Sequence, residues 1–445
     1  MTAASDPPAV ADAGAPAGHH AGGPVSARSY LRLTLLGAAI GIPAALVAAA
    51  LFAAIRVLQD WLWQELPATL GYAEPPWFLV VAIPVVGAVL VVIARRALPG
   101  DGGHSPLHGL DPGPAPLRYA PGIILAALGT LCFGAVLGPE MPVIALGAIT
   151  GTAFAQAARV EGQGRTVLAM AGSFSAISAL FGGPLVAGML LVEGGLSAGA
   201  QLLRVLLPGL VAAAIGYTIF VGLGDWGGIS EAPLAVPDLA TYDGTTVVDL
   251  AAGLGIGIVA ALLVVATKAA GVMIDRRSAN APLVIIGGGA AIGVLAIAAS
   301  ALGAQPEDVL FSGQASIPVL VGESSTIAVL VLLVAKAIGY AISLGTGFRG
   351  GPIFPAIFLG VAVASVGVSA LGMSPTLAIA IGASAGMAAQ TQLLISPLLF
   401  AALLVGPAGA DAMPAAVLAT VGAWLTVELI DRRRAIDGGT EVDTP

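Results

Sequence analysis

The stretch GPEMPVIALG at residues 138–147 returns as GPIFPAIFLG at residues 351–360, and this repetition decides which fold the sequence predicts. Six of the ten positions are identical, at an offset of 213 residues. The same offset aligns the run LLV at residues 190–192 with LLV at residues 403–405. Separate matches at one offset indicate two homologous halves of the chain.

Each copy interrupts an apolar run with glycine and proline, which is typical of membrane helices that stop partway through the bilayer. The first turn of such a helix has backbone N–H groups without intrahelical partners and carries a partial positive charge. Two such ends that meet would bind a small anion without a fixed cation. The candidate anion-binding residues of these two breaks are Gly138, Pro139, Met141 and Gly351.

The composition excludes a soluble enzyme and a disordered chain, because 58% of the 445 residues are hydrophobic and 9% are charged. A soluble domain carries about 25% charged residues. We therefore expect an all-α polytopic membrane protein. Apolar stretches follow one another from residue 31 to residue 430, and one of them covers residues 121–137. Several are shorter than the roughly 20 residues of a full span.

Arginines gather at the edges of the apolar runs and predict which ends face the cytoplasm. They predict cytoplasmic termini and a multi-pass protein of the inner cell membrane, with Trp61, Trp63 and Trp77 as interfacial anchors on the outer side. The predicted organisation is a disordered tail at 1–27, a first membrane half at 28–225, a linker at 226–245, a second half at 246–434 and a tail at 435–445.

Two carboxylates lie inside apolar segments, whereas the other acidic residues lie in loops or tails. Glu140 lies in the first break, and Glu193 ends the helix that begins near Pro184. The repeat partners of these two glutamates are Ile353 and Gly406, so the second half lacks both carboxylates. Because a carboxylate in hydrocarbon is costly, Glu140 is a candidate gate that competes with an anion; a helix-capping role is the alternative. For Glu193 the alternatives are a proton path and a helix end that reaches water.

With these residues in view, the chain resembles the CLC family of chloride channels and chloride/proton antiporters, and within it a divergent bacterial branch. GPEMP at residues 138–142 is similar to the family motif G-x-E-G-P, and GGPIFP at residues 350–355 is similar to G-G-I-F-A-P. FGGPL at residues 181–185 is similar to F-N-A-P-L. The resemblance implies a CLC-like inverted repeat with broken, tilted helices, and one pore in each subunit of a homodimer. It also implies that Glu140 is the gating glutamate and that the amides of Ile353 and Phe354 bind the anion.

Four departures from the family pattern bear on mechanism. Pro352 has no N–H, so one amide donor is absent. Ser105 is the nearest hydroxyl to the family's pore serine but is out of register with it, and the last tyrosine, Tyr340, lies too early in the chain to be the family's pore tyrosine. The second glutamate of the family's E-E pair is replaced by Gly194.

Two cations near these segments each leave two interpretations open. Lys336 lies inside an apolar run, where it either reaches the membrane interface or lines an ion path. Arg349 precedes the second break, where it either supplies positive potential at a pore mouth or anchors the helix.

The sequence predicts transmembrane transport of chloride or a similar small anion. A passive channel is favoured, because Gly194 replaces the second glutamate of the family's E-E pair. A coupled anion/proton antiporter is the alternative. Enzymatic activity is not expected, because all four histidines precede residue 109 and no pair of aspartates lies within the spans. We also expect no cofactor, no metal and no nucleic-acid partner; the single cysteine, Cys132, cannot form an intrachain disulfide.

Overall fold

The computed structural model describes residues 27–109, 113–195, 200–227, 234–278 and 281–437, and the regular structure in these ranges is helical. Eight of the helices are long and apolar enough to cross a membrane, so the chain is a multi-pass membrane protein, as the composition predicts. The two tails predicted to be disordered lie almost entirely outside the described residues, as does part of the predicted linker.

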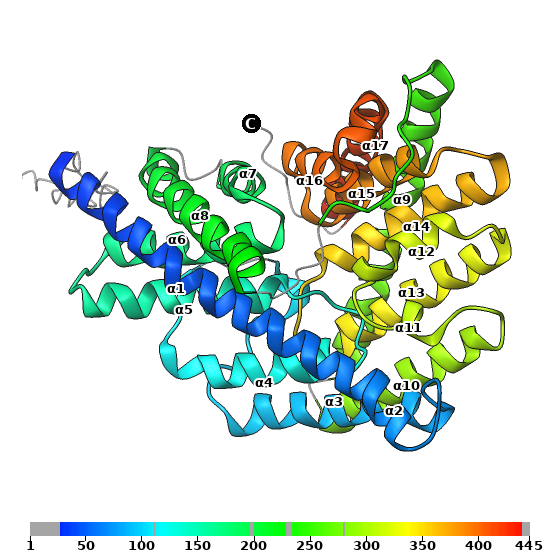
Figure 1. Ribbon diagram of the computed structural model, residues 1–445, viewed down its shortest axis with the longest axis horizontal. Helices are drawn as coiled ribbons and strands as arrows, with labels where there is room; N and C mark the ends of the chain where they lie inside the picture. Colours follow the sequence, from blue (N-terminus) through cyan, green and yellow to red (C-terminus); the bar gives the residue numbers. More distant parts are fainter. Residues whose placement is uncertain (1–26, 110–112, 196–199, 228–233, 279–280, 438–445) are drawn as a thin grey trace, which may run out of the picture.

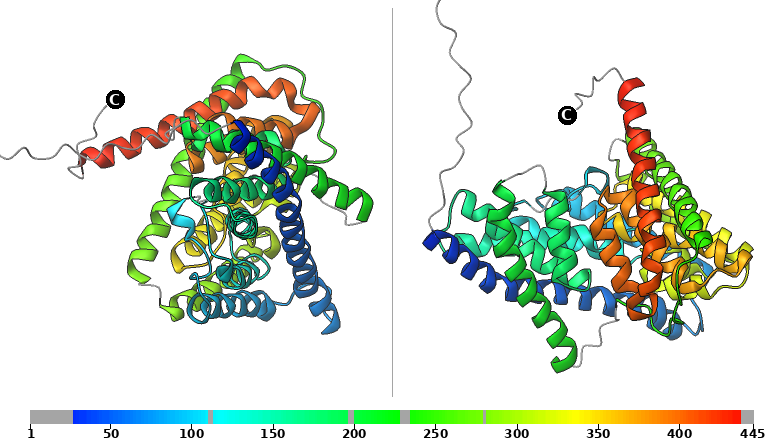
Figure 2. Two further views of the ribbon diagram at one scale, coloured as in Figure 1. Left: turned by 90° about the vertical axis from the view of Figure 1, so that its left-hand side faces the viewer. Right: turned by 90° about the horizontal axis from the view of Figure 1, so that it is seen from above.

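Helices α5 to α8 lie on one side of the molecule and α12 to α17 on the other, while α1 runs across to the second side, where α2 lies near α10 (Figure 1). In chain order the helices form two sets, one ending at Gly227 and one beginning at Val247. The first set comprises α1 (Ala27–Asp60), η1 (Trp61–Glu65), α2 (Leu66–Thr69), α3 (Trp77–Ala97), η2 (Pro106–His108), η3 (Leu117–Tyr119), α4 (Ala120–Leu131), α5 (Glu140–Ala157), α6 (Gln163–Leu180), α7 (Pro184–Gly194) and α8 (Ala200–Gly227). The second set comprises α9 (Val247–Ser278), α10 (Pro282–Ser300), α11 (Pro306–Val309), η5 (Gln314–Ser316), α12 (Ile317–Gly322), α13 (Thr326–Thr346), α14 (Ile353–Leu371), α15 (Pro375–Thr391), α16 (Ile395–Val405), η6 (Gly406–Ala412) and α17 (Met413–Asp437). The long helices α9 and α17 pack against each other at the edge of the second set (Figure 2).

Broken helices occur where the repeated stretch predicts them. Helix α5 begins at Glu140 and α14 begins at Ile353, which are 213 residues apart, the offset of the repeat. The helices α7 and α16 have 11 residues each. At 1.5 Å per residue such a helix is about 16 Å long, which is too short to cross a hydrocarbon core of about 30 Å.

Glycine contacts bring α5 and α6 together. A Cβ atom at Gly147 would lie 2.6 Å from the carbonyl oxygen of Gly172, and a Cβ atom at Gly151 would collide with the carbonyl oxygen of Leu168. The second half repeats this packing, because a Cβ atom at Gly360 in α14 would collide with α15. Small residues at such crossings allow close backbone approach in membranes, where association depends on packing rather than on water.

The apolar stretch at residues 121–137 does not form one helix, because α4 ends at Leu131. Residues 132–139, which begin with a turn at 132–134, connect α4 to the first turn of α5. Trp63 contacts this connection, since its indole Nε1 donates to the carbonyl of Cys132 at 2.9 Å. The prediction that Trp63 is an interfacial anchor is therefore wrong: Trp63 is buried, while Trp61 and Trp77 are exposed.

Gly151→Leu is expected to destabilise the fold by about 2 kcal/mol or more, because the larger side chain overpacks the crossing of α5 and α6. Thermal unfolding of the detergent-solubilised protein measures this. Gly255→Leu is the control, because Gly255 is exposed in α9 and a Cβ atom there would meet nothing within 4 Å. Equal melting temperatures for the two variants would contradict the proposed packing constraint.

Candidate functional site

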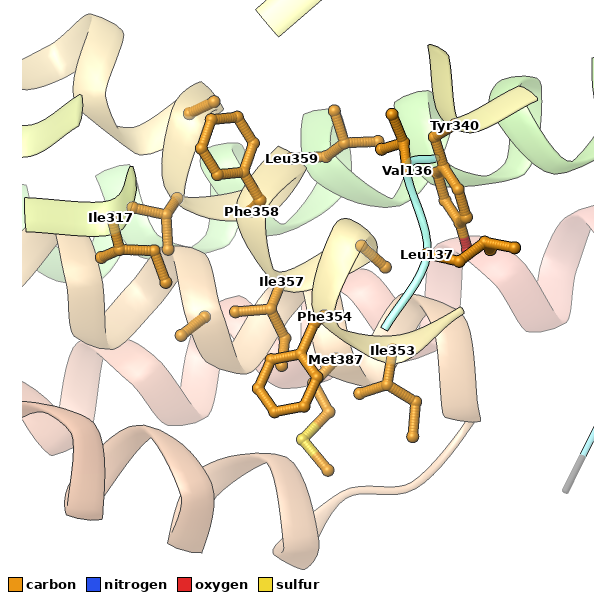
Figure 3. Packing of buried hydrophobic residues seen from close by; sticks show 14 of the residues in the cluster. Val136, Leu137, Ile317, Tyr340, Ile353, Phe354, Ile357, Phe358, Leu359 and Met387 are labelled. Atoms are coloured by element: carbon orange, nitrogen blue, oxygen red, sulfur yellow. The ribbon is translucent and has the colours of Figure 1, made fainter. Parts of the chain in front are cut away.

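The first turns of α5 and α14 meet through a pair of backbone hydrogen bonds. The N–H of Gly138 donates to the carbonyl of Gly351 at 2.7 Å, and the N–H of Gly351 donates to the carbonyl of Gly138 at 2.5 Å. Figure 3 shows the connection that carries Val136 and Leu137 passing between Tyr340 and the start of α14 at Ile353. The two segments that the repeat predicts to be equivalent are thus adjacent in space.

Glu140 is fully buried, with 0% of its surface exposed, and its carboxylate reaches the first turn of the other broken helix. Its Oε1 accepts a hydrogen bond from the N–H of Phe354 at 2.7 Å, and the amide of Ile353 also acts on the carboxylate. Its Oε2 has no hydrogen-bond partner among the described residues. A carboxyl group therefore lies at the electropositive end of α14 with only part of its hydrogen-bonding capacity met.

Glycine is required on both sides of this carboxylate. A Cβ atom at Gly351 would overlap Oε2 of Glu140, and a Cβ atom at Gly138 would also collide with the carboxylate. These two glycines form the space in which a carboxylate, or an ion of similar size, fits against the helix ends. Of the candidate residues in the breaks, Gly138 and Gly351 therefore contact Glu140 directly, while Pro139 immediately precedes the first turn of α5.

A small cavity of about 10 Å³ lies beside the residue that follows Glu140. This is room for about one water-sized particle. Met141, predicted as a site residue, contributes to its wall, and so does Arg349, whose guanidinium pairs with Asp101. Arg95 also pairs with Asp101, at 3.0 Å, so two cations share one carboxylate. Arg349 thus anchors the loop before α14 through Asp101, while its role in supplying positive potential at a pore mouth stays a prediction.

Several residues of this region were missed in the sequence. Tyr340 is fully buried, and its hydroxyl lies 2.8 Å from the carbonyl oxygen of Pro352 and 3.3 Å from Oε1 of Gln390. The ring of Phe354 stacks on Phe181 with 5.6 Å between centroids, and the edge of Phe400 contacts both rings. No spacing rule connects the missed residues, since they come from four different segments: Phe181, Tyr340, Gln390 and Phe400. The FGGPL motif was the one available signal, for Phe181.

Ser105 does not line the cavity. Its Oγ accepts a long hydrogen bond, 3.4 Å, from the N–H of Leu107 and caps the short helix η2. The role of Ser105 as an anion ligand stays a prediction.

Glu193 lies at the end of α7 and caps the first turn of α16. Its Oε1 accepts from the N–H groups of Leu394 and Ile395 at 2.9 and 2.7 Å, and its Oε2 accepts from the N–H and hydroxyl of Ser396 at 2.6 and 2.5 Å. Neither alternative for Glu193 included this contact. A carboxylate with four donors at a helix N-terminus is a stabilising arrangement, and the proton path through Glu193 stays untested.

Comparisons with known proteins agree with this arrangement. Residues 103–428 match a family model described as "Voltage gated chloride channel". The "Putative ion-transport protein YfeO" of Escherichia fergusonii is 32% identical over 352 residues, covering 76% of this chain and 79% of the relative. A homologue with the same description from Escherichia coli strain SMS-3-5 is also 32% identical, with the same coverage.

Solved structures of low sequence identity share the fold. A slow cyanobacterial Cl⁻/H⁺ antiporter has a TM-score of 0.73 at 16% identity, covering 90% of this chain and 95% of that one. A CLC-type fluoride/proton antiporter has a TM-score of 0.69 at 21% identity, covering 90% and 96%. The fold is therefore the CLC fold, as the sequence predicted.

Glu193→Ala is expected to lower the melting temperature, because it removes the cap of α16 at a cost of about 1–2 kcal/mol. Thermal unfolding of the purified protein measures this, with Glu65→Ala, at an exposed position in η1, as the control. A Glu193→Ala protein that melts like the unmutated chain would contradict the capping role.

Proposed function

Since this chain belongs to the voltage gated chloride channel family, we propose that it carries small anions, chloride foremost, across the membrane along a path gated by Glu140. One path runs through each subunit of a homodimer in the inner cell membrane, with both termini in the cytoplasm. The observation that carries the proposal is the contact between the Glu140 carboxylate and the N–H of Phe354.

This contact supports the proposal that the pocket accepts a small anion. The carboxylate is an anion held by a helix-end amide, between two glycines whose lack of side chains makes the space. A halide in the same place would accept from the same amide and feel the same helix dipole. The side chain and the transported anion therefore compete for one position, and the path opens when the carboxylate leaves it.

Protonation weakens the binding of the Glu140 side chain at the end of α14. A neutral carboxyl group has no attraction for the positive end of α14, whereas a halide keeps that attraction. The proposed gate thus opens more often as the pH falls, because the competing charge on Glu140 is removed.

Arg349 supplies a buried cation beside Met141 in support of the proposal. It is almost fully buried and contributes to the wall of the cavity beside the helix ends. Arg349 and Arg95 both pair with the carboxylate of Asp101, and Asp275 also acts electrostatically on Arg349. An anion beside this cavity would lie close to the guanidinium of Arg349, whose positive charge favours it.

Passive conduction is the preferred form of the proposal. Coupled exchange needs a second proton-handling group, and Gly194 provides no side chain for one. The neighbouring Glu193 has four hydrogen-bond donors at α16, which favour its charged, capping form. Coupled exchange remains the second candidate, because two of the proteins that share the fold are anion/proton antiporters.

Glu140→Gln and Glu140→Ala are expected to make anion flux nearly independent of pH, because neither side chain can titrate. Between about pH 4 and pH 8, a range that brackets carboxylate and histidine titration, the unmutated protein should change its flux by about tenfold and the variants by less than about twofold. Chloride efflux from proteoliposomes measures this. His104→Gln is the control, because His104 also contributes to the wall of the cavity. Full pH dependence in both Glu140 variants would refute the gate.

Proton coupling is tested in the same vesicles with a pH-sensitive dye. A chloride gradient imposed on the unmutated protein should move no protons against their gradient, because conduction is passive. Uphill proton movement that scales with chloride flux and disappears in Glu140→Ala would replace the channel by the antiporter. Replacing chloride by fluoride, nitrate and bromide in turn then defines the selectivity.

A further inference from the structure

Lys336 is the buried charge that the proposed gate does not use. It lies in the middle of α13 with 0% of its surface exposed, so the interpretation that it reaches the membrane interface is wrong. Its Nζ donates to the carbonyl of Leu310 at 2.7 Å and to the carbonyl of Phe311 at 3.3 Å. The ring of Phe358 lies 4.7 Å from the same nitrogen. Burying an ionisable side chain in a membrane protein costs free energy, so we ask what these partners of Lys336 do.

The two carbonyls that bind Lys336 belong to a tight corner after α11. Phe311 has a backbone φ of +60°, in the left-handed region that residues other than glycine rarely adopt. Such a conformation persists where surrounding contacts impose it. Here the Lys336 ammonium donates hydrogen bonds to the carbonyls of the two peptide units that flank the Phe311 Cα.

The same corner contacts the connection that leads to Glu140. The N–H of Phe311 approaches the carbonyl of Gly134 at 3.4 Å, and the Phe311 ring meets Trp63 edge to face at 5.4 Å. Trp63 in turn donates to the carbonyl of Cys132. Residues 132–134, at the start of the connection, are therefore held between Trp63 and the corner that Lys336 binds.

Helix α13 holds the connection at a second place. Ser343, which lies seven residues after Lys336, accepts a hydrogen bond from the N–H of Val136 at 2.9 Å. Two residues later, Gly138 pairs with Gly351, and Glu140 follows. The position of the Glu140 backbone is thus set by a series of contacts from other elements, because residues 132–139 form no helix of their own.

We propose that Lys336 is a positioning residue for the Glu140 gate: its buried ammonium clamps the corner at residues 310–311 against the connection that carries Glu140. The clamp keeps the carboxylate seated at Phe354 in the closed state. Without it the corner and the connection loosen, and the carboxylate leaves its place more often. This inference rests on the proposed gating role of Glu140.

Few other charged groups among the described residues act on Lys336 or on Glu140. Asp308 in α11 is the acid that acts electrostatically on Lys336, and α14 presents the uncharged ring of Phe358 to it. Glu140 is faced by backbone amides of α14 and by the hydroxyl-bearing Tyr340 of α13. A change in pH response on replacing Lys336 is therefore transmitted through the connection rather than through a direct ion pair.

The test compares Lys336→Met, Lys336→Arg and Lys268→Met. Lys268 is the other lysine of the chain and lies exposed in α9, which makes it the matched control. Chloride efflux from proteoliposomes at low and high pH gives a flux ratio for each variant. Lys336→Met should lower this ratio about threefold or more, by raising flux at high pH where the gate is shut. Lys336→Arg, which keeps the charge and the donors, should restore most of the ratio, and Lys268→Met should not change it.

The same substitutions in the Glu140→Gln background separate the clamp from other roles. If Lys336 acts through the gate, Lys336→Met has no further effect on flux there. An effect of equal size in both backgrounds, or an unchanged ratio in the single variant, overturns the inference. Unaltered pH dependence in Glu140→Gln alone would instead refute the gate itself. Should Lys336→Met fail to fold, Lys336→Gln, which keeps an N–H donor without charge, replaces it with the same expected direction.

Discussion

The site depends on one contact, the backbone pairing of Gly138 with Gly351. It joins two helices that both begin inside the protein and so brings the first turn of each within reach of the other. Without this pairing, the Glu140 carboxylate could not meet an amide of α14. Glycine is needed at both positions, because a side chain on either would occupy the space of the carboxylate.

Three buried charges around this pairing are stabilised in three different ways. Glu140 has a helix-end amide and leaves one oxygen without a partner among the described residues. Lys336 has two backbone carbonyls and an aromatic ring. Arg349 has the carboxylate of Asp101. The incompletely satisfied group suits a moving part, since little holds it in place, while the two better-satisfied cations suit fixed roles.

Sequence patterns were reliable where chemistry is local. The repeated breaks predicted the starts of α5 and α14, because glycine and proline act on the backbone of their own segment. Sequence patterns failed where the packing of other segments determines a side chain's environment. Trp63 was predicted to be an interfacial anchor, but it donates to the carbonyl of Cys132 inside the protein. Lys336 was long enough to reach the membrane interface, but it is buried. A side chain that fits two environments is assigned to one of them only by what packs around it.

By itself the sequence determined the helical membrane fold, the family and the identity of the carboxylate at the break, since composition, repeat and motif are all properties of residue order. The tertiary structure decided which groups face that carboxylate: an amide 214 positions later and the hydroxyl of Tyr340 near Pro352. It also decided that Lys336 binds the carbonyls of Leu310 and Phe311. It also decided that Glu193 caps α16, a helix whose first turn lies about 200 residues away in the chain. These contacts join segments distant in sequence, and only the packing of helices against one another sets them.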